Sequence, residues 1–255
     1  MNKFLETIAF LRRSLFKSII SFRFSSIYLF NILDQMKTVG PESLGIVMIT
    51  AFFTGIVFTI QFVKEFLYIN AVSLIGAVLT LAFIRELSPV LTSVIVVGRI
   101  GSYFTAELAT MSITQQLDAL YLLEIGPLSY LVLPRIIALV AMLPLLNCFS
   151  LITSLFASSF ICFTLYNVYP DVFFASSFSS LLLTDLIKSF LKTFVFGFLI
   201  SLISCTCGLT TRGGSKAVGQ STTFSVIISL LAIFIFDFLL SYIMFSRVES
   251  SIKTL

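Results

Sequence analysis

The stretch from Arg99 to Leu120 reads RIGSYFTAELATMSITQQLDAL and interrupts an otherwise apolar chain. It is mostly polar, and Gly98 and Gly101 provide a hinge at its start. On each side lies an apolar segment long enough to cross a bilayer as a helix. Because a short turn is enough to join two membrane-spanning helices, we expect this longer helical insert to contact a soluble partner.

The composition indicates an all-α polytopic membrane protein. Hydrophobic residues make up 58% and charged residues 11% of the 255-residue chain, whereas soluble domains average about 25% charged residues. Apolar runs of about 20 residues recur, the length that a transmembrane helix needs. We expect a single membrane domain over residues 1–255, too short to include a nucleotide-binding domain. The net charge of +4 is small and dispersed, so nucleic acid is not an expected partner.

The residue types needed for metal or nucleophile chemistry are scarce. The chain has no histidine, so Ser-His and Cys-His nucleophile pairs are excluded. Its cysteines lie in or beside apolar runs, where membrane packing is the expected role, and not at metal-site spacing. We expect no catalytic residue, no metal and no cofactor. An intramembrane lipid-modifying enzyme, the alternative, would need a surface cluster rich in His, Asp or Lys.

The apolar runs predict five transmembrane helices, at about residues 44–63, 74–97, 130–165, 190–209 and 224–245. The turn Gly40-Pro41-Glu42 introduces the first, and loops are expected at 64–73 and 167–185. Pro134 and Pro144 are expected to split the third region into an entry segment and a kinked span.

Residues from about 4 to 23 predict an amphipathic helix that lies in the membrane interface. Its apolar positions follow helical spacing, and Arg12, Arg13 and Lys17 lie mostly off that stripe. A basic, Ser-rich transit peptide is the alternative. Residues 1–38 are thus expected to be an interfacial helix with its connection, and residues 40–245 the transmembrane core.

The distribution of Lys and Arg predicts the orientation. An inside N terminus and five spans leave ten cations on the inner side and five on the outer side. The positive-inside rule therefore places the N terminus in the cytoplasm or stroma and the C terminus across the membrane. The inner set is Lys3, Arg12, Arg13, Lys17, Arg23, Lys37, Arg99, Arg135, Arg212 and Lys216; the outer set is Lys64, Lys188, Lys192, Arg247 and Lys253.

Arg85 and Glu86 lie near the middle of the second span, where a charge costs about 2.5–3.5 kcal/mol on insertion scales. Neighbours on a helix point about 100° apart, so we expect each to find a partner on another helix. Pro89 has no N–H to donate to the Arg85 carbonyl, which leaves an acceptor free. The two residues are interpreted either as the wall of a polar cavity for lipid headgroups or as a structural pair. Asp237, in the fifth span, is expected to pair with a cation on another helix; a single carboxylate cannot form a proton relay.

The insert itself predicts a helix over residues 112–123. Ser112 is a candidate N-cap, with Gln115 in capping-box position, and Gly126-Pro127 is expected to end the helix. Gln116, Asp118 and Tyr121 would then be exposed. On periodicity alone, a solvated amphipathic loop is the alternative.

A second polar segment, Thr210–Thr223, joins the fourth and fifth spans. Gly213 and Gly214 allow backbone conformations closed to other residues, and Arg212 can bond carbonyls or a lipid phosphate. We expect a tight structural turn formed by Arg212, Gly213 and Gly214, with direct lipid contact as the alternative.

Many short motifs occur in a consistent order. They are RELSPVLT (85–92), GRIG (98–101), AELATM (106–111), TQQLDAL (114–120), GP (126–127), LPR (133–135), KTFVFG (192–197), CGLTTRGG (207–214), VG (218–219), TT (222–223) and DF (237–238). Over about residues 40–245 the chain thereby resembles the MlaE-type permeases of lipid ABC transporters, in the branch of algal plastid-encoded and plant plastid lipid-import members. Ser88 and Ala109 replace glycines of the family pattern, and Gln116 replaces an acid, which argues against a charge-based docking role at position 116.

The resemblance implies a homodimer that moves phospholipid or a plastid lipid precursor through a pocket at the dimer interface. It implies that the insert is a coupling helix for a separate ABC-type ATPase subunit, and that an MCE-domain subunit caps the opposite side. Within Ala106–Leu120, Glu107 and Asp118 are expected to be exposed to the ATPase. The full expected coupling set is Glu107, Thr114, Gln116, Asp118, Ala119 and Leu120, and the candidate lipid-pocket or intramembrane polar set is Arg85, Glu86, Arg99 and Asp237.

The resemblance favours a plastid (chloroplast) inner envelope, with a bacterial inner membrane as the alternative. A bias towards Phe, Ile, Leu and Ser without Trp is typical of AT-rich genes, as in plastids. A stand-alone secondary transporter is the alternative function, but it would usually show an inverted repeat, and the two motif blocks are not self-similar.

Overall fold

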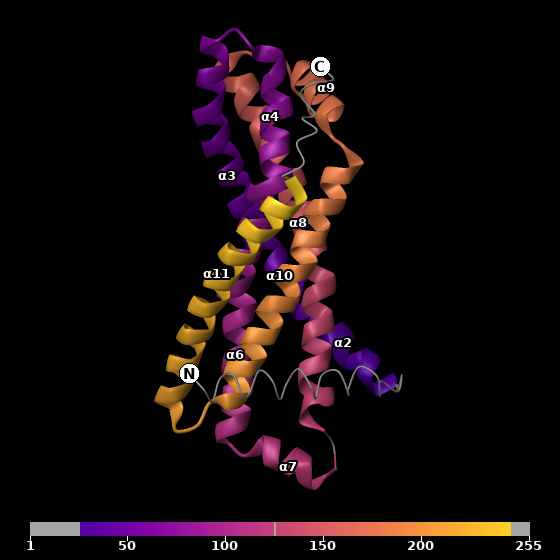
Figure 1. Ribbon diagram of the computed structural model, residues 1–255, viewed down its shortest axis with the longest axis vertical. Helices are drawn as coiled ribbons and strands as arrows, with labels where there is room; N and C mark the ends of the chain where they lie inside the picture. The colour runs from indigo at the N-terminus through magenta and orange to yellow at the C-terminus, as the bar shows by residue number, and fades with distance from the viewer. Residues whose placement is uncertain (1–25, 125, 246–255) are drawn as a thin grey trace. The chain divides into compact units, whose positions relative to one another are not determined.

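The computed structural model describes residues 26–124 and 126–245, which form helices and short connections without a β-strand (Figure 1). The predicted interfacial helix at residues 4–23 lies outside this part of the chain. The α-helices are α2 (Ser26–Val39), α3 (Pro41–Tyr68), α4 (Ile75–Ala82), α5 (Ser88–Val96), α6 (Ser102–Ile113), α7 (Gln116–Leu122), α8 (Leu133–Tyr166), α9 (Pro170–Ser180), α10 (Leu183–Thr210) and α11 (Ser215–Phe245). Between them lie the 3₁₀ turn η1 (Val72–Leu74) and the π-helical turns η2 (Phe83–Leu87), η3 (Val97–Gly101) and η4 (Leu128–Val132).

Five helical segments of the described chain are long and apolar enough to cross a membrane. They confirm the predicted all-α, multi-pass architecture with five spans. The segments are Leu29–Tyr68, Val72–Ile113, Leu128–Tyr166, Leu183–Thr210 and Ser215–Met244.

The spans extend beyond the apolar runs that predicted them. The fourth begins at Leu183 and the fifth at Ser215, so the loop between them shrinks to residues 211–214. A hydropathy pattern stops at the first charged residues, whereas a helix continues as long as its peptide groups can bond to one another. α10 therefore includes three charged residues that the sequence pattern placed near or before the start of the fourth span. They are Asp185, Lys188 and Lys192.

The predicted split of the third span at two prolines is wrong, while the predicted kink stays a prediction. α8 runs from Leu133 to Tyr166 with Pro144 inside it. Pro134 is its second residue and lies inside a continuous helical run, because η4 leads directly into α8 and the Leu133 N–H bonds back to the Leu128 carbonyl. The segment that enters the span is instead η4, directly before α8.

The described residues divide by their contacts into two compact units. The first unit contains residues 26–43, 96–143 and 195–234, and the second contains residues 44–95, 144–194 and 235–245. Five of the described helices contribute residues to both units: α3, α5, α8, α10 and α11.

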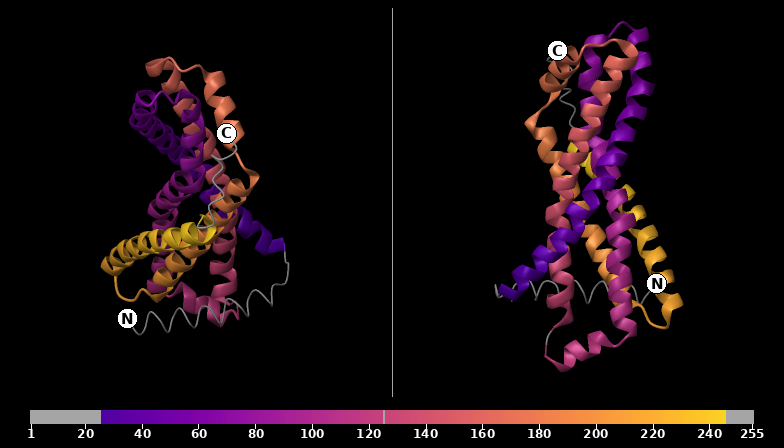
Figure 2. Two further views of the ribbon diagram at one scale, coloured as in Figure 1. Left: turned by 45° about the horizontal axis from the view of Figure 1, so that its top comes forward. Right: turned by 180° about the vertical axis from the view of Figure 1, so that it is seen from behind.

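The second unit contains a helix that the sequence pattern did not predict. α9 occupies much of the expected loop 167–185 and lies along α4 (Figures 1 and 2). Gly76 makes this close approach possible, because a Cβ at this position would lie 2.3 Å from the carbonyl oxygen of Phe173. Phe173 is itself buried in the apolar core of this unit, which comprises Val63, Ile75, Leu79, Phe83, Cys162, Val168 and Phe173.

In the first unit, α7 lies at one end and connects α6 to the segment that leads into α8 (Figures 1 and 2). The insert is shorter than predicted, because the helical run continues through α6 to Ile113. Gln115 then adopts a left-handed conformation, with φ 59°, and α7 begins at Gln116. Ser112 is therefore not an N-cap; its hydroxyl donates to the Thr211 carbonyl at 3.1 Å. α7 ends at Leu122, ahead of Gly126-Pro127.

Candidate functional site

The intramembrane charges lie on the π-helical turn η2, and Pro89 explains this local geometry. Pro89 has no N–H to donate to the Arg85 carbonyl, so the regular α-helical pattern cannot continue through this point. The Ser88 N–H bonds to the Phe83 carbonyl, one residue further back than in an α-helix. The Arg85 carbonyl instead accepts a hydrogen bond from Lys192 Nζ at 2.7 Å. The Arg85 carbonyl thus lacks its helical donor, as predicted, and Lys192 on α10 supplies a hydrogen bond in its place.

Lys192 is the centre of a buried ionic cluster in the second unit. Its side chain is 0% exposed, and Nζ lies 3.1 Å from Glu86 Oε1 and 3.0 Å from Asp237 Oδ1. It also donates to Ser241 Oγ at 2.7 Å, and Ser241 in turn donates to Glu86 Oε1 at 2.8 Å. One ammonium thus joins a carboxylate from η2 to a carboxylate from α11.

Arg85 pairs with a different carboxylate. Its Nη2 and Nε donate to Asp185 Oδ2 at 2.8 and 3.1 Å, and Lys188 Nζ lies 3.9 Å from Asp185 Oδ1. Asp185 is 3% exposed, whereas the Arg85 side chain is 31% exposed. Together with Lys192, Glu86 and Asp237, the cluster balances three cations with three carboxylates, which lowers the cost of placing charge in a membrane.

These contacts confirm that Arg85 and Glu86 find partners on other helices and that Asp237 pairs with a cation. Sequence reasoning missed Lys192 and Asp185 as members of the cluster. It placed Asp185 at the end of the loop 167–185 and counted Lys192, near the start of the predicted fourth span, with the outer-side cations. A usable signal was present: Asp185, Lys188 and Lys192 are three and four residues apart, the spacing of one helix face.

A hydrogen-bonded chain of neutral side chains lies in the same unit. Ser88 Oγ donates to Asn147 Oδ1 at 2.7 Å, and Asn147 Nδ2 donates to Ser189 Oγ at 3.0 Å. All three residues are buried. The serine at position 88, where the family pattern has glycine, thereby links η2 and α5 to α8 and α10.

Arg99 lies in the first unit, on η3. Its Nη2 is 3.6 Å from Glu42 Oε2, and the two side chains are 32% and 49% exposed. The structure thus gives Arg99 its own carboxylate partner, separate from the partners of Arg85.

The helix α7 is the second candidate site. None of its residues is buried, and Gln116, Asp118 and Ala119 are exposed, as is Thr114 just before it. The predicted exposure of Gln116, Asp118 and Tyr121 is confirmed, while Leu120 is half-buried. Apolar side chains are exposed as well: Tyr121 by 59%, Leu122 by 86% and Leu123 by 68%.

Glu107 differs from the other residues of the expected coupling set. It lies on α6, and its carboxylate is 2.7 Å from Arg135 Nη2. The expectation that Glu107 is open to a soluble partner is therefore wrong, because an ion pair within the first unit already holds its side chain.

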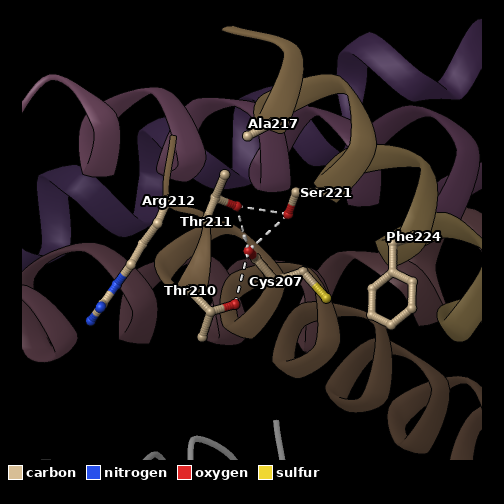
Figure 3. Close-up of a pocket in the computed structure, with 7 residues that line it drawn as sticks. All are labelled: Cys207, Thr210, Thr211, Arg212, Ala217, Ser221 and Phe224. Carbon is tan, nitrogen blue, oxygen red and sulfur yellow. Dashed lines mark hydrogen bonds between the residues drawn. The ribbon is translucent and has the colours of Figure 1, made fainter. Parts of the chain in front are cut away.

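The turn between α10 and α11 forms a small hydroxyl-lined pocket of about 220 Å³ (Figure 3). The Cys207 carbonyl accepts hydrogen bonds from Thr211 at 2.8 Å and from Ser221 at 2.9 Å, which joins the end of α10 to the start of α11. Gly213 has φ 124°, a conformation that other residues rarely adopt. The Arg212 side chain extends away from the hydroxyl cluster (Figure 3).

Comparison with known proteins agrees with this architecture. The profile of the permease MlaE family matches residues 32–243. The probable ABC transporter permease protein ycf63 of Pyropia yezoensis is 46% identical over 99% of this chain and 96% of its own. The probable ABC transporter permease protein slr1045 of Synechocystis is 50% identical over 84% and 82%. The protein TRIGALACTOSYLDIACYLGLYCEROL 1, chloroplastic, of Arabidopsis thaliana is 44% identical over 88% and 64%. This chain therefore belongs to the MlaE permease family, and it is a multi-pass membrane transport protein, not an enzyme.

Proposed function

We propose that this permease moves membrane lipid, phospholipid or a plastid lipid precursor, using energy from a separate ATPase subunit that docks on α7. The observation that carries the proposal is α7 itself, a surface helix without a buried residue, between two membrane-spanning segments. Its exposed Tyr121, Leu122 and Leu123 offer the apolar contacts, and Asp118 the charged contact, that a protein partner uses.

The need for a partner follows from the sequence. The chain has no phosphate-binding loop of the type GxxxxGK[ST], so nucleotide energy has to reach it through another subunit. Cations of the described first unit, Lys37, Arg99, Arg135, Arg212 and Lys216, belong to the set that the charge distribution assigns to the inner side. α7 lies in the same unit, which supports docking from the cytoplasm or stroma.

In the second unit, we assign headgroup contact to Arg85 and Glu86, two of the partly exposed members of the ionic cluster. Glu86 is 44% and Arg85 is 31% exposed, so each can reach a lipid headgroup while it keeps its partner. Lys192 and Asp185 are almost fully buried and hold those two side chains in place.

The assembly that we propose is a homodimer with an MCE-domain subunit on the outer side, in the plastid inner envelope. In the most apolar window of the fifth span, 11% of the residues are buried, compared with 56% in the second span. A second copy of the chain would cover part of this open surface. The red algal and chloroplastic relatives support the plastid location, and the cyanobacterial relative keeps a bacterial inner membrane as the alternative.

The docking proposal is tested by affinity purification of the full-length permease in mild detergent. The unmodified protein is expected to bring the ATPase with it, and Asp118→Arg to lose it while remaining inserted. Asp171→Arg, which reverses an exposed charge on α9 in the second unit, is the matched control and should retain the ATPase. Retention by Asp118→Arg as well would reject α7 as the docking site. Lipid movement by the purified permease without ATPase would instead favour the stand-alone transporter.

A further inference from the structure

In the first unit, an ion pair between a buried arginine and a half-buried glutamate joins α6 to α8. Arg135 Nη2 lies 2.7 Å from Glu107 Oε2, and the Arg135 side chain is 2% exposed. The guanidinium carbon also lies 5.3 Å from the centre of the Phe104 ring, within the range of a cation–π contact. Phe104 and Glu107 are three residues apart on α6, so one face of this helix holds the guanidinium at two points.

The pair encloses the insert that carries α7. Residues 108–134 lie between its two members, and α7 has no buried residue of its own. The position of α7 therefore depends on the segments at its two ends. At one end, Arg135 follows directly after the start of α8 at Leu133.

At the other end, α6 is held against α10. The Ser112 hydroxyl donates to the Thr211 carbonyl at 3.1 Å. The helix backbones approach so closely that a Cβ at Gly208 would lie 2.6 Å from Leu108 Cβ and 3.0 Å from the Thr105 carbonyl oxygen. The start of α8 is tied to α6 and α10 by two kinds of contact. Val132 packs with Leu108 and Cys205 in one apolar cluster, and the Glu107–Arg135 ion pair adds the polar contact between α6 and α8.

An ion pair at this position fixes how α6 and α8 are aligned more than it adds to the stability of the fold. Replacing a buried ion pair by apolar side chains of similar volume is often neutral or stabilising. Apolar side chains, however, tolerate sliding, whereas the Arg135 guanidinium meets α6 at two points, the Glu107 carboxylate and the face of the Phe104 ring, which fixes its position along that helix. The pair is thus suited to keep α6 and α8 in register while a force acts on the segment between them.

We propose that Glu107 and Arg135 are positioning residues that hold α6 and α8 in register, so that movement of α7 is passed to both helices. This inference rests on the proposed docking of the ATPase on α7. Without the pair, the ATPase would still bind and hydrolyse ATP, but less lipid would move in each cycle.

The test uses the complete transporter in proteoliposomes, with NBD-labelled phosphatidylglycerol as the lipid probe. The main variant is Glu107→Leu/Arg135→Met, which removes both charges and keeps an apolar contact. We expect near-normal thermal stability and ATPase retention, with lipid moved per ATP lowered about 2- to 30-fold, the range seen for contacts in coupling networks. Asp34→Asn removes an exposed carboxylate of the same unit and should leave the ratio unchanged.

The outcomes separate this inference from the docking proposal. If the double variant keeps both normal stability and the normal amount of lipid moved per ATP, the pair is a structural contact only and the inference is wrong. If it loses the ATPase, the pair acts on docking and the inference is also wrong. If the double variant does not insert, Glu107→Gln, which keeps the side-chain shape, replaces it, and a normal ratio in that variant would overturn the inference. Failure of the unmodified permease to retain the ATPase would reject the docking proposal itself.

Discussion

Replacement of Lys192 by methionine tests the ionic cluster most directly. Methionine keeps the unbranched apolar stem but removes the ammonium that joins Glu86 to Asp237. Asp237 is 17% exposed and would lose the ammonium that balances its charge, while Glu86, at 44% exposure, can be hydrated and contributes less. Removing one partner of a buried ion pair costs about 3–5 kcal/mol.

The expected loss is large enough to measure by thermal unfolding of the detergent-purified protein. At about 2–4 °C per kcal/mol for a chain of this size, Lys192→Met should lower Tm by roughly 6–20 °C. The matched control is Lys188→Met on the same helix, because Lys188 is 33% exposed and 3.9 Å from its carboxylate. Surface ion pairs are worth about 0–1 kcal/mol, so the control should change Tm by no more than about 4 °C.

A rescue experiment identifies the cause of the loss. The neutral triple variant Lys192→Met/Glu86→Gln/Asp237→Asn removes the uncompensated carboxylates and should recover most of the lost Tm. If Lys192→Met unfolds at the temperature of the unmodified protein, or if the triple variant is as unstable as the single one, charge compensation is not what Lys192 provides.

Three further predictions concern packing, backbone geometry and topology. Gly76→Val should lower stability by about 1–3 kcal/mol, because its side chain would overlap the Phe173 carbonyl. The control Gly45→Ala, with no atom within 4 Å of its Cβ, should not lower stability. Equal Tm values for the two variants would show that α9 does not pack on α4 as described. Gly213→Val should lower stability by about 1–3 kcal/mol, because Gly213 has a positive φ. Its control is Gly214→Ala, since Gly214 has open space around its Cβ position and no positive φ. Lost transport with a normal Tm would instead indicate that the turn contacts lipid. Tags at the two ends of the chain should be accessible from opposite sides of the membrane, since five spans place them there, and labelling of both from one side would require an even number of crossings.

Local properties of the chain were enough to predict the architecture. Apolar runs gave the number of spans, because each helix in a bilayer has to bury its own backbone hydrogen bonds and present an apolar surface to lipid. The same reasoning predicted that Arg85, Glu86 and Asp237 would not remain unpaired, because an isolated charge in a membrane is too costly. Pro89 indicated that the Arg85 carbonyl would lack its usual helical donor, since the missing N–H is a covalent property of proline.

The tertiary structure decided which groups meet. Lys192 joins Glu86 to Asp237, and Asp185 pairs with Arg85. These partners lie 45 to 106 residues apart in the chain and meet only because of how each helix is rotated and packed. α9 could not be recognised from its apolar pattern, because it is stabilised by close packing at Gly76. Glu107 has the pattern of a surface charge in the sequence, but Arg135 reaches it, and the Phe104 ring beside it, only once α6 and α8 lie side by side. Composition and spacing determine what each helix requires, and only packing determines which neighbour supplies it, because partners for a buried charge are chosen by distance in space and not along the chain.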